Sequence, residues 1–305
     1  MRSNNSLRRN GKYRRSMRQI LGFNFYDVFV FLFCIVFALV CVYPMWYVLV
    51  ASVTPYEEYI KGGLMLWPTG GVDLQYYKAI FSTKSFTNSM WISVSKTVIA
   101  TVLSVLVTAS MAYGVSKVHV KGMKVINALV VFNLFFTGGL IPQYILYQNL
   151  GLLRNYWVMV IPGALNITYF IIMRNYYSYS VPKSLEEAAL LDGCTEIGVL
   201  FRIMLPISKP ALTTVTLFYA VDHWNDFFSA IMYINSKQAW PLQLFLRSML
   251  FQNDAAYSSG GESLFLLGQP MKMAAVMMAI IPIMCAYPFF QKYFTTGMTA
   301  GAVKG

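Results

Sequence analysis

Six long apolar stretches alternate with shorter polar segments along the chain. Each stretch is continuously apolar, whereas a lipid-facing β-strand alternates apolar and polar residues, so the pattern indicates helices and disfavours a membrane β-barrel. Because about 20 helical residues cross a hydrocarbon layer ~30 Å thick, each stretch predicts one transmembrane helix. The predicted spans are roughly residues 28–53, 88–114, 125–148, 157–174, 211–234 and 273–293.

The composition supports this prediction. Hydrophobic residues make up 57% of the 305-residue chain and charged residues only 12%, which is more apolar surface than one soluble core can hide. The expected fold class is therefore an all-α integral membrane protein. The cysteines show no spacing typical of a disulfide framework or a zinc site, and no metal site is predicted; they are Cys34, Cys41, Cys194 and Cys285.

Positive charge is concentrated at the amino terminus. Residues 1–24 carry seven basic and no acidic side chains, and such a segment stays on the cytoplasmic side of the membrane. We interpret it as a basic cytoplasmic tail, followed by a transmembrane domain over residues 25–305. Alternation of the six spans then places residues 175–209 and the carboxyl terminus in the cytoplasm. The net charge of +12 is thus explained by topology and by contact with anionic lipid, without nucleic-acid binding.

Glycine and proline interrupt the third predicted span. Gly138, Gly139 and Pro142 lie near its predicted outer end, where glycines ease bending and a proline removes one backbone hydrogen bond. We expect a kink or a helix break there. Freed backbone groups are tolerated at membrane depth only beside protein or a cavity, so this end is expected to face the helix bundle.

The cytoplasmic segment 175–209 is predicted to contain two short helices. Ser184 and Glu187 have the S-x-x-E spacing of a capping box, which predicts that the first helix begins at residue 185. Gly193 is expected to end this helix by adopting a left-handed conformation.

The second short helix is expected over residues 195–203. Pro206 is expected to stop it, because proline cannot donate the backbone hydrogen bond that a continuing helix needs. Pro210 suits the first turn of the fifth predicted span, where the missing donor has no cost.

The first of these helices has the composition of a docking element. Ala188 and Ala189 are small enough to allow close packing into a groove of another protein, and Glu187 and Asp192 are available to polar partners. From spacing alone, an amphipathic segment that merely lies on the membrane surface is an equal alternative.

The segment resembles a known motif. Glu187-Ala188-Ala189, Gly193, Ile203 and Leu205-Pro206 have the spacing EAA-x3-G-x9-I-x-LP of permease subunits in bacterial ABC importers. Residues 138–153 and 301–305 are similar to the corresponding regions of carbohydrate-type, maltose-permease-like members. The resemblance implies the type I ABC importer permease fold, with this segment docked in a cleft of a cytoplasmic ATPase. The ATPase-coupling residues that it implies are Glu186, Glu187, Ala188, Ala189, Asp192, Gly193, Ile203, Leu205 and Pro206.

No Walker A sequence occurs, so the expected ATP and Mg belong to a partner ATPase. The chain itself is expected to hold no cofactor and to catalyse no reaction. The resemblance implies a second homologous permease subunit, two ATPase subunits, an extracellular solute-binding lipoprotein and a sugar substrate as partners. It also implies a bacterial plasma membrane location with both termini cytoplasmic.

A polar patch lies midway along the fifth predicted span. Asp222, His223, Asn225 and Asp226 would each be costly in lipid, so they are expected to face the bundle interior or water. Trp224-Asn225-Asp226 resembles an element of sugar-permease fifth spans. With Asp222, these three residues are the predicted substrate or pathway residues, since a stacking face and hydrogen-bond acceptors suit a hydroxyl-rich ligand.

Other interpretations of this patch remain open. The polar residues also suit interhelical pairing, for instance with Lys96 of the second predicted span. A proton-coupled secondary transporter or channel would use Asp222, His223 and Asp226 as a relay. An intramembrane hydrolase would need a nucleophile and a base, yet His119 and His223 are the only histidines. The function that we predict is a permease subunit of an ATP-driven importer for carbohydrate, specifically oligosaccharide.

Overall fold

The computed structural model describes residues 25–63, 65–68, 70–117, 120–251 and 268–302. The elements of these residues are all helices, which confirms the predicted all-α class. The predicted basic tail, residues 1–24, and the last three residues of the chain lie outside the described residues. The chain divides into two compact units, residues 1–48 and residues 49–305.

The described part of the first unit belongs to one apolar helix. This helix, α2 (Phe25–Val53), is long and apolar enough to cross a bilayer, as predicted for the first span. Its residues 26–46 are all exposed within the chain. Exposed apolar side chains are favourable in lipid, so this surface is expected for a transmembrane helix that has hydrocarbon or another subunit as its neighbour.

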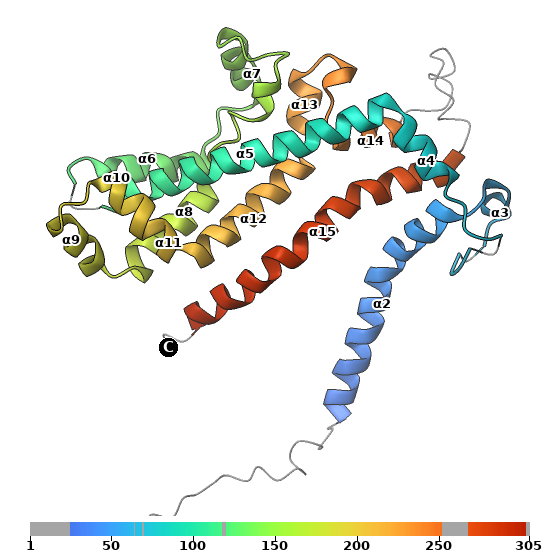
Figure 1. Cartoon of the computed structure of the whole chain (residues 1–305), viewed down its shortest axis with the longest axis horizontal. Coiled ribbons are helices and arrows are strands. Elements are labelled where there is room, and N and C mark those ends of the chain that lie inside the picture. The colour runs from blue at the N-terminus through green and yellow to red at the C-terminus, as the bar shows by residue number, and fades with distance from the viewer. Residues whose placement is uncertain (1–24, 64, 69, 118–119, 252–267, 303–305) are drawn as a thin grey trace, which may run out of the picture. The chain divides into compact units, whose positions relative to one another are not determined.

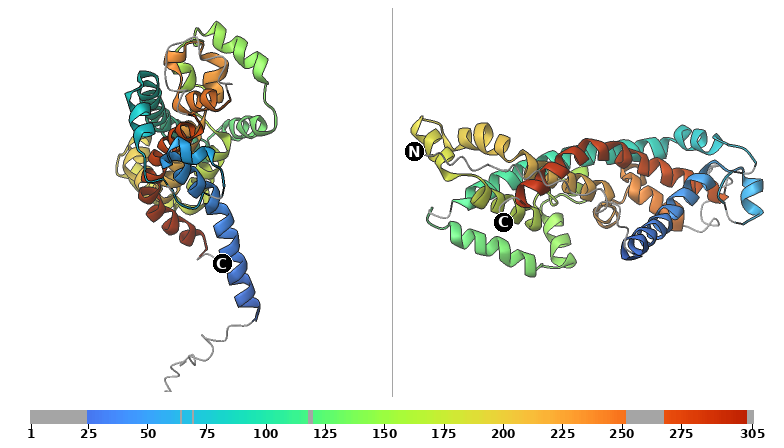
Figure 2. Two further views of the ribbon diagram at one scale, coloured as in Figure 1. Left: turned by 90° about the vertical axis from the view of Figure 1, so that its right-hand side faces the viewer. Right: turned by 90° about the horizontal axis from the view of Figure 1, so that it is seen from below.

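The central helix of the second unit is α5 (Lys84–Ser116). It packs against α8 (Ile167–Asn175), α12 (Lys209–Asn225) and α14 (Leu242–Phe251), while α15 (Gly268–Ala302) packs against α12. Figures 1 and 2 show α5, α12 and α15 running side by side. The other elements are α3 (Tyr56–Ile60), α4 (Gln75–Ser82), α6 (Met123–Phe135), α7 (Leu140–Asn149), η1 (Tyr156–Met159), η2 (Tyr176–Ser180), α9 (Lys183–Leu191), α10 (Glu196–Val199), η3 (Leu200–Met204), α11 (Leu205–Ile207), α13 (Phe228–Tyr233) and η4 (Lys237–Ala239).

Three helices of the described residues are long and apolar enough to cross a membrane: α2, α5 and the first part of α15, Gly268–Ala286. A fourth is counted if the strongly bent pair Glu196–Ile207 and Lys209–Asn225 forms one span. The six-span count stays a prediction, because the third, fourth and fifth predicted spans are interrupted helices.

The interruptions occur where the sequence is least suited to a helix. The third predicted span is broken between α6 and α7, and Gly139 has a positive φ of 85°, so the break predicted at Gly138-Gly139 is confirmed. In the fourth, residues 160–166 separate η1 from α8 and include Pro162 and Gly163. In the fifth, Asp226 is extended between α12 and α13.

The buried face of α5 carries polar side chains that bind the other helices, some of them at these interruptions. Ser93 Oγ accepts a hydrogen bond of 2.7 Å from the backbone amide of Leu242, the first residue of α14. Lys96, Ser104 and Thr108 follow at helical spacing and are also buried. Backbone groups freed by a helix break must be satisfied inside a membrane protein, and α5 supplies several of these partners.

The predicted short helices of residues 175–209 are present with different ends. The first, α9, begins at Lys183 after Pro182, and no side chain caps it, so the capping box of Ser184 and Glu187 is wrong. Pro182 supplies the extended residue before the helix, which places Ser184 already inside the first turn. The predicted end is confirmed: Gly193 has φ 83°, and the amides of Cys194 and Gly193 bond to the carbonyls of Ala189 and Leu190 as in a Schellman motif.

The second predicted helix extends past its expected stop at Pro206. It runs from α10 through the π-helical turn η3 to α11, which ends at Ile207. The wider π-turn directly before Pro206 accommodates a residue without an amide donor, so the proline does not end the helix. The chain then bends by 86° into α12, with Pro210 in its first turn as predicted. We call residues 183–207 the elbow.

Candidate functional site

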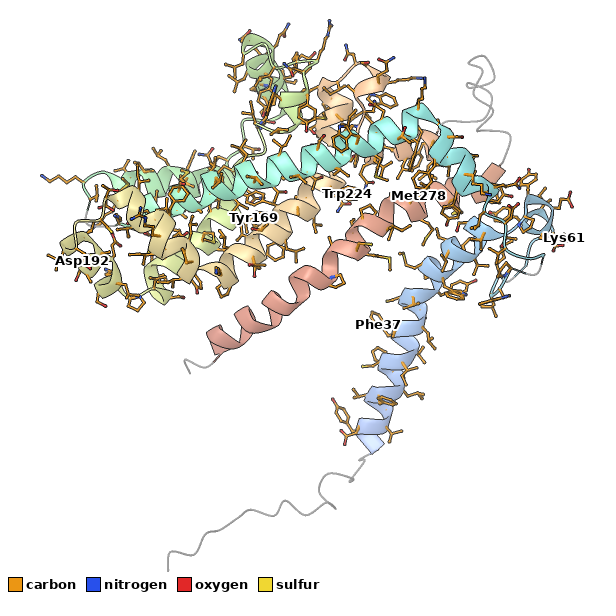
Figure 3. The ribbon with its side chains drawn as sticks, in the orientation of Figure 1. Phe37, Lys61, Tyr169, Asp192, Trp224 and Met278 are labelled. Carbon is orange, nitrogen blue, oxygen red and sulfur yellow. The ribbon has the colours of Figure 1, made fainter. Side chains whose placement is uncertain are left out.

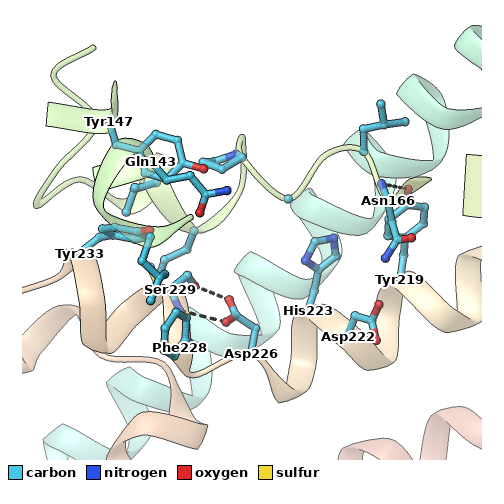
Figure 4. A pocket seen from close by; sticks show the side chains of 16 residues that line it. Gln143, Tyr147, Asn166, Tyr219, Asp222, His223, Asp226, Phe228, Ser229 and Tyr233 are labelled. Carbon is cyan, nitrogen blue, oxygen red and sulfur yellow. Dashed lines mark hydrogen bonds between the residues drawn. The ribbon is translucent and has the colours of Figure 1, made fainter. Parts of the chain in front are cut away.

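A pocket of about 350 Å³ lies beside the middle of α5, among the interrupted helices. It is lined by residues of α7, η1, the segment before α8, α12 and α13 (Figure 4). Ser104 and Thr108 of α5 contact pocket-lining residues of α12, and Lys96 contacts Asp226 just after α12. These three positions bracket the centre of α5. The volume is within the range of small-molecule sites, ~300–1,000 Å³.

Asp226 forms one wall of the pocket and is paired with a buried cation. Lys96 Nζ donates to the Asp226 carboxylate and to its backbone carbonyl, both at 2.8 Å. Lys96 is only 1% exposed. The same carboxylate accepts from the amide and the hydroxyl of Ser229 at the start of α13 (Figure 4). The interhelical pairing with Lys96, an alternative interpretation of the polar patch, is thus present, and it fixes the junction between α12 and α13.

Asp222 lies one helical turn before Asp226 and has a different environment. Its side chain is exposed and lines the pocket. Tyr169 donates a hydrogen bond of 2.7 Å from its hydroxyl to Asp222 Oδ2. No cation lies within 4 Å of this carboxylate among the described residues. Asp222 therefore brings an uncompensated negative charge to the pocket.

His223 and Tyr219 connect the pocket to α5 and to the segment before α8. His223 Nε2 lies 3.0 Å from Ser104 Oγ, which donates to the carbonyl of Gly163. Tyr219 stacks on His223. Both bonds of Ser104 can form at once if His223 Nε2 carries a proton and donates it to Ser104 Oγ, while the serine hydroxyl donates to the Gly163 carbonyl.

The Tyr219 hydroxyl holds the start of α8. It accepts from the backbone amide of Asn166 at 2.8 Å and shares a hydrogen bond of 2.6 Å with Thr108 Oγ1. Asn166 in turn caps α8 through its side chain. These contacts satisfy the backbone of the interrupted fourth predicted span.

The remaining lining combines aromatic faces with amide and hydroxyl groups. Tyr147, Tyr233 and Phe228 supply rings, and Gln143 supplies an amide. No lysine or arginine is among the described residues that line the pocket. Stacking faces with hydrogen-bonding groups, both donors and acceptors, suit a ligand rich in hydroxyl groups.

The structure separates the four residues predicted to line a pathway. Asp222 and Asp226 line the pocket, whereas Trp224 and Asn225 do not. Trp224 is buried in the hydrophobic cluster with Met271 and Met278 of α15, and Figure 3 shows it on the side of α12 toward α15. Asn225 is exposed outside the pocket lining. Direct ligand contact by Trp224 and Asn225 remains a prediction without support from this geometry.

The elbow divides the motif residues into two groups. Ala189 is buried and Ile203 and Leu205 pack against the hydrophobic cluster beneath the elbow, so these three anchor it. An exposed group points away from the bundle: Glu187, Ala188, Asp192, Gly193 and Pro206.

Two large apolar side chains add to this outer surface. Leu191 is 89% exposed and Ile197 is 71% exposed. Figure 3 shows Asp192, the next residue after Leu191, at the tip of the elbow. Exposed apolar residues on a rigid helical elbow are typical of a docking surface.

Lys117, the residue after α5, forms ion pairs with both arms of the elbow, as we call α9 and α10, and we call these pairs the clamp. Its Nζ lies 2.8 Å from Glu186 of α9 and also pairs with Glu196 of α10. The single proton of the Tyr113 hydroxyl is shared between the two carboxylates, at 3.3 Å from Glu186 and 3.0 Å from Glu196, and the centre of its ring lies 4.4 Å from the ammonium. Burial lowers the pKa of Lys117, but the hydrogen bonds to Glu186 and Glu196 outweigh burial and raise the pKa above its ordinary value. Glu186, predicted for docking, is thus half-buried in this clamp.

Sequence reasoning missed Lys117, Tyr113, Ser104 and Tyr169. Lys117 is recognisable as the first charge after an apolar span, but nothing local identifies its partners some 70 to 80 positions later. A hydroxyl in an apolar helix is likewise too common to indicate which ones bind across helices.

Comparison with known proteins gives concordant matches. A family profile described as binding-protein-dependent transport system inner membrane component matches residues 123–300. The chain is 39% identical over 285 residues to the polygalacturonan/rhamnogalacturonan transport system permease protein YtcP of Bacillus subtilis (strain 168), covering 92% of this chain and 98% of YtcP. It is 29% identical over 276 residues to the arabinooligosaccharides transport system permease protein AraQ of Halalkalibacterium halodurans, covering 88% of this chain and 93% of AraQ.

A solved structure also matches. A chain in the crystal structure of a bacterial ABC transporter involved in the import of the acidic polysaccharide alginate superposes with a TM-score of 0.80 and 30% sequence identity. The match covers 92% of this chain and 99% of that chain.

Proposed function

Because this chain belongs to the family of binding-protein-dependent transport system inner membrane components, we propose that it is the permease subunit of an ATP-driven importer for carbohydrate, specifically oligosaccharide. Its fold is that of an ABC importer permease, as predicted, and the protein is a multi-pass membrane protein. The polygalacturonan/rhamnogalacturonan and arabinooligosaccharide transport systems to which its relatives YtcP and AraQ belong support a carbohydrate substrate. The hydroxyl, amide and aromatic lining of the pocket supports it independently.

One observation supports coupling to a separate ATPase. Lys117 fixes both arms of the elbow to the end of α5, while the outer surface around Asp192 is exposed and partly apolar. A partner that binds this surface and moves would also displace α5. The ion pairs of Lys117 and the packed side chains of Ile203 and Leu205 keep the elbow from deforming on its own.

The path from the elbow to the pocket is continuous. α5 carries Lys117 at its end and Lys96, Ser104 and Thr108 beside the pocket. Movement of α5 would therefore reach the interrupted helices that surround the pocket. In the proposed cycle, ATP-driven closure of a cytoplasmic ATPase dimer moves the elbow, and the pocket changes its access from one side of the membrane to the other.

The proposed assembly contains a second homologous permease, two ATPase subunits that bind ATP and Mg, and an extracellular solute-binding lipoprotein. The elbow and both termini lie on the cytoplasmic side of a bacterial plasma membrane. The proton-coupled alternative has weaker geometric support, because Asp226 is held by Lys96 and Ser229 and is not free to relay protons.

Affinity purification of the tagged chain from its native membrane, in mild detergent, tests the coupling surface. We expect an ATPase subunit to co-purify with the wild-type chain and to be lost or uncoupled with Gly193→Arg. Gly151→Arg is the matched control, since Gly151 also has a positive φ after a helix and open space around it. An ATPase that stays bound and fully stimulated in the Gly193→Arg variant would contradict docking at the elbow.

Uptake in cells separates the transport mechanisms. The proposal expects sugar uptake to stop on ATP depletion and to continue when only the proton gradient is collapsed. The opposite result would favour the proton-coupled transporter.

A further inference from the structure

The charged residues that line the pocket present a net negative charge to its interior. Asp222 and Asp226 are the charged residues among its described lining. Lys96 compensates Asp226 from behind, at 2.8 Å and almost fully buried, so its ammonium is not presented to a ligand. Among the described residues, Asp222 accepts a side-chain hydrogen bond only from the neutral Tyr169 hydroxyl. The pocket therefore presents one net negative charge.

We propose that this pocket binds an uncharged stretch of oligosaccharide and that Asp222 determines this specificity by repelling carboxylated sugars. The inference rests on the proposed function and adds the chemical class of the substrate. Asp222 acts in two ways: its free oxygen accepts from a sugar hydroxyl, and its charge opposes a uronate at the same place.

The geometry gives Asp222 a fixed position for this role. The hydrogen bond from Tyr169 occupies Oδ2, and no contact to Oδ1 is recorded among the described residues. Tyr169 itself packs against Tyr219, whose hydroxyl is held by Thr108 and the amide of Asn166. A carboxylate held by a packed ring stays at the pocket wall, and it does not swing toward Lys96.

The size of the effect follows from the distance. Two like charges about 4 Å apart repel enough to change affinity about fivefold even in water, and more in a less polar pocket. A neutral sugar is not repelled, and one of its hydroxyl groups can still donate a hydrogen bond to the free oxygen of Asp222. Asp226 contributes little to it, because the adjacent ammonium of Lys96 cancels its charge.

The relatives named above transport sugars of two kinds, acidic and uncharged. Alginate is acidic, and polygalacturonan is a polymer of uronic acid, whereas arabino-oligosaccharides are uncharged. Despite greater identity to the polygalacturonan/rhamnogalacturonan permease, this chain has the pocket charge expected for the uncharged class. The proposed substrate class therefore follows from the charge of the pocket and not from overall sequence identity.

Ligand binding to the whole co-purified complex in lipid nanodiscs tests the inference. The probes are α-1,5-arabinotriose and trigalacturonate, titrated by saturation-transfer NMR. We expect arabinotriose to bind at least about fivefold more tightly than trigalacturonate, and Asp222→Asn to improve trigalacturonate binding about fivefold relative to arabinotriose. Asp222→Glu keeps the charge and is expected to keep the preference.

Glu57→Gln is the matched control, since it removes an exposed carboxylate that is not part of the pocket lining and is expected to leave the ratio unchanged. Equal or tighter binding of trigalacturonate to the wild-type complex, or an unchanged ratio in Asp222→Asn, would overturn the inference. ATP-driven uptake of sugar by the same complex reconstituted in proteoliposomes distinguishes this failure from failure of the proposed importer function.

Discussion

Lys117 Nζ and Glu186 Oε1 lie 2.8 Å apart and join the end of α5 to the first helix of the elbow. The same ammonium also reaches Glu196 on the next helix. A single side chain thus bridges two arms that the sequence separates with the Gly193 turn. The elbow is held against α5 as a rigid lever, and its two arms cannot move independently without breaking one of these pairs.

Replacing Lys117 with methionine is expected to uncouple the importer without unfolding it. Pairs of this kind, with Glu196 58% exposed, contribute only about 0.2–1 kcal/mol each to stability, so the chain should still fold and assemble. Transport should fall severalfold more than ATP hydrolysis. The measurement is the coupling ratio, the number of sugar molecules transported per ATP hydrolysed in proteoliposomes.

Two further variants distinguish the clamp from a general charge effect. Lys117→Arg keeps the cation and should recover part of the coupling ratio. Lys124→Met removes an exposed cation on α6 and should change nothing. A normal coupling ratio in Lys117→Met would show that the elbow is held by its packed residues alone.

The pair formed by Lys96 and Asp226 is expected to dominate local stability. Removing Asp226 leaves the almost fully buried Lys96 ammonium uncompensated, which costs about 3–5 kcal/mol, whereas removing Lys96 leaves a carboxylate that is 29% exposed and costs less. Asp226→Asn should therefore lower the thermal unfolding temperature of the purified complex strongly, and Lys96→Met should lower it to a smaller extent. The double variant should be less destabilised than the sum of the single variants, because no isolated charge remains. Strict additivity in this cycle would contradict the pairing.

The sequence predicted this region better than its neighbours, for physical reasons. A charge in an apolar span must be compensated, so Lys96 and the acids of the fifth predicted span were natural partners. The break at Gly139 was predictable from local backbone preference, as was the left-handed turn at Gly193.

Where several local solutions compete, the sequence was a weaker guide. Ser184 has the right spacing for a cap, yet Pro182 starts the helix earlier. Pro206 has the right chemistry to stop a helix, yet the π-turn before it lets the helix continue. The side of α12 that Trp224 faces depends on packing against α15, which its neighbours in sequence do not reveal.

Tyr219→Phe is expected to loosen the start of α8. The substitution removes the hydroxyl that accepts from the Asn166 amide and bonds Thr108, which leaves the buried Thr108 hydroxyl and the half-buried Asn166 amide without this partner. The expected cost is about 1–3 kcal/mol of stability. Amide hydrogen exchange of the complex should show faster exchange at residues 166–169, while Tyr179→Phe, an exposed tyrosine, serves as the control. Unchanged protection of these amides would mean that water replaces the hydroxyl.

Gly163→Ala is expected to disturb the pocket through His223. A Cβ atom at Gly163 would lie 3.3 Å from His223 Cε1, so the ring must shift, but Ser104 and the stacked Tyr219 hold it. Overpacking of this kind costs about 1–3 kcal/mol and should lower both the unfolding temperature and ligand affinity.

Gly114→Ala is the matched control for Gly163→Ala, because Gly114 lies within α5 with open space around it. Alanine there should be neutral or stabilising by about 0.5–1 kcal/mol. Adding His223→Ala to Gly163→Ala should restore part of the lost stability, because the crowded ring is gone. If Gly163→Ala alone is as stable as the wild type, the His223 ring has freedom to move, and its contacts with Ser104 and Tyr219 do not fix this wall of the pocket.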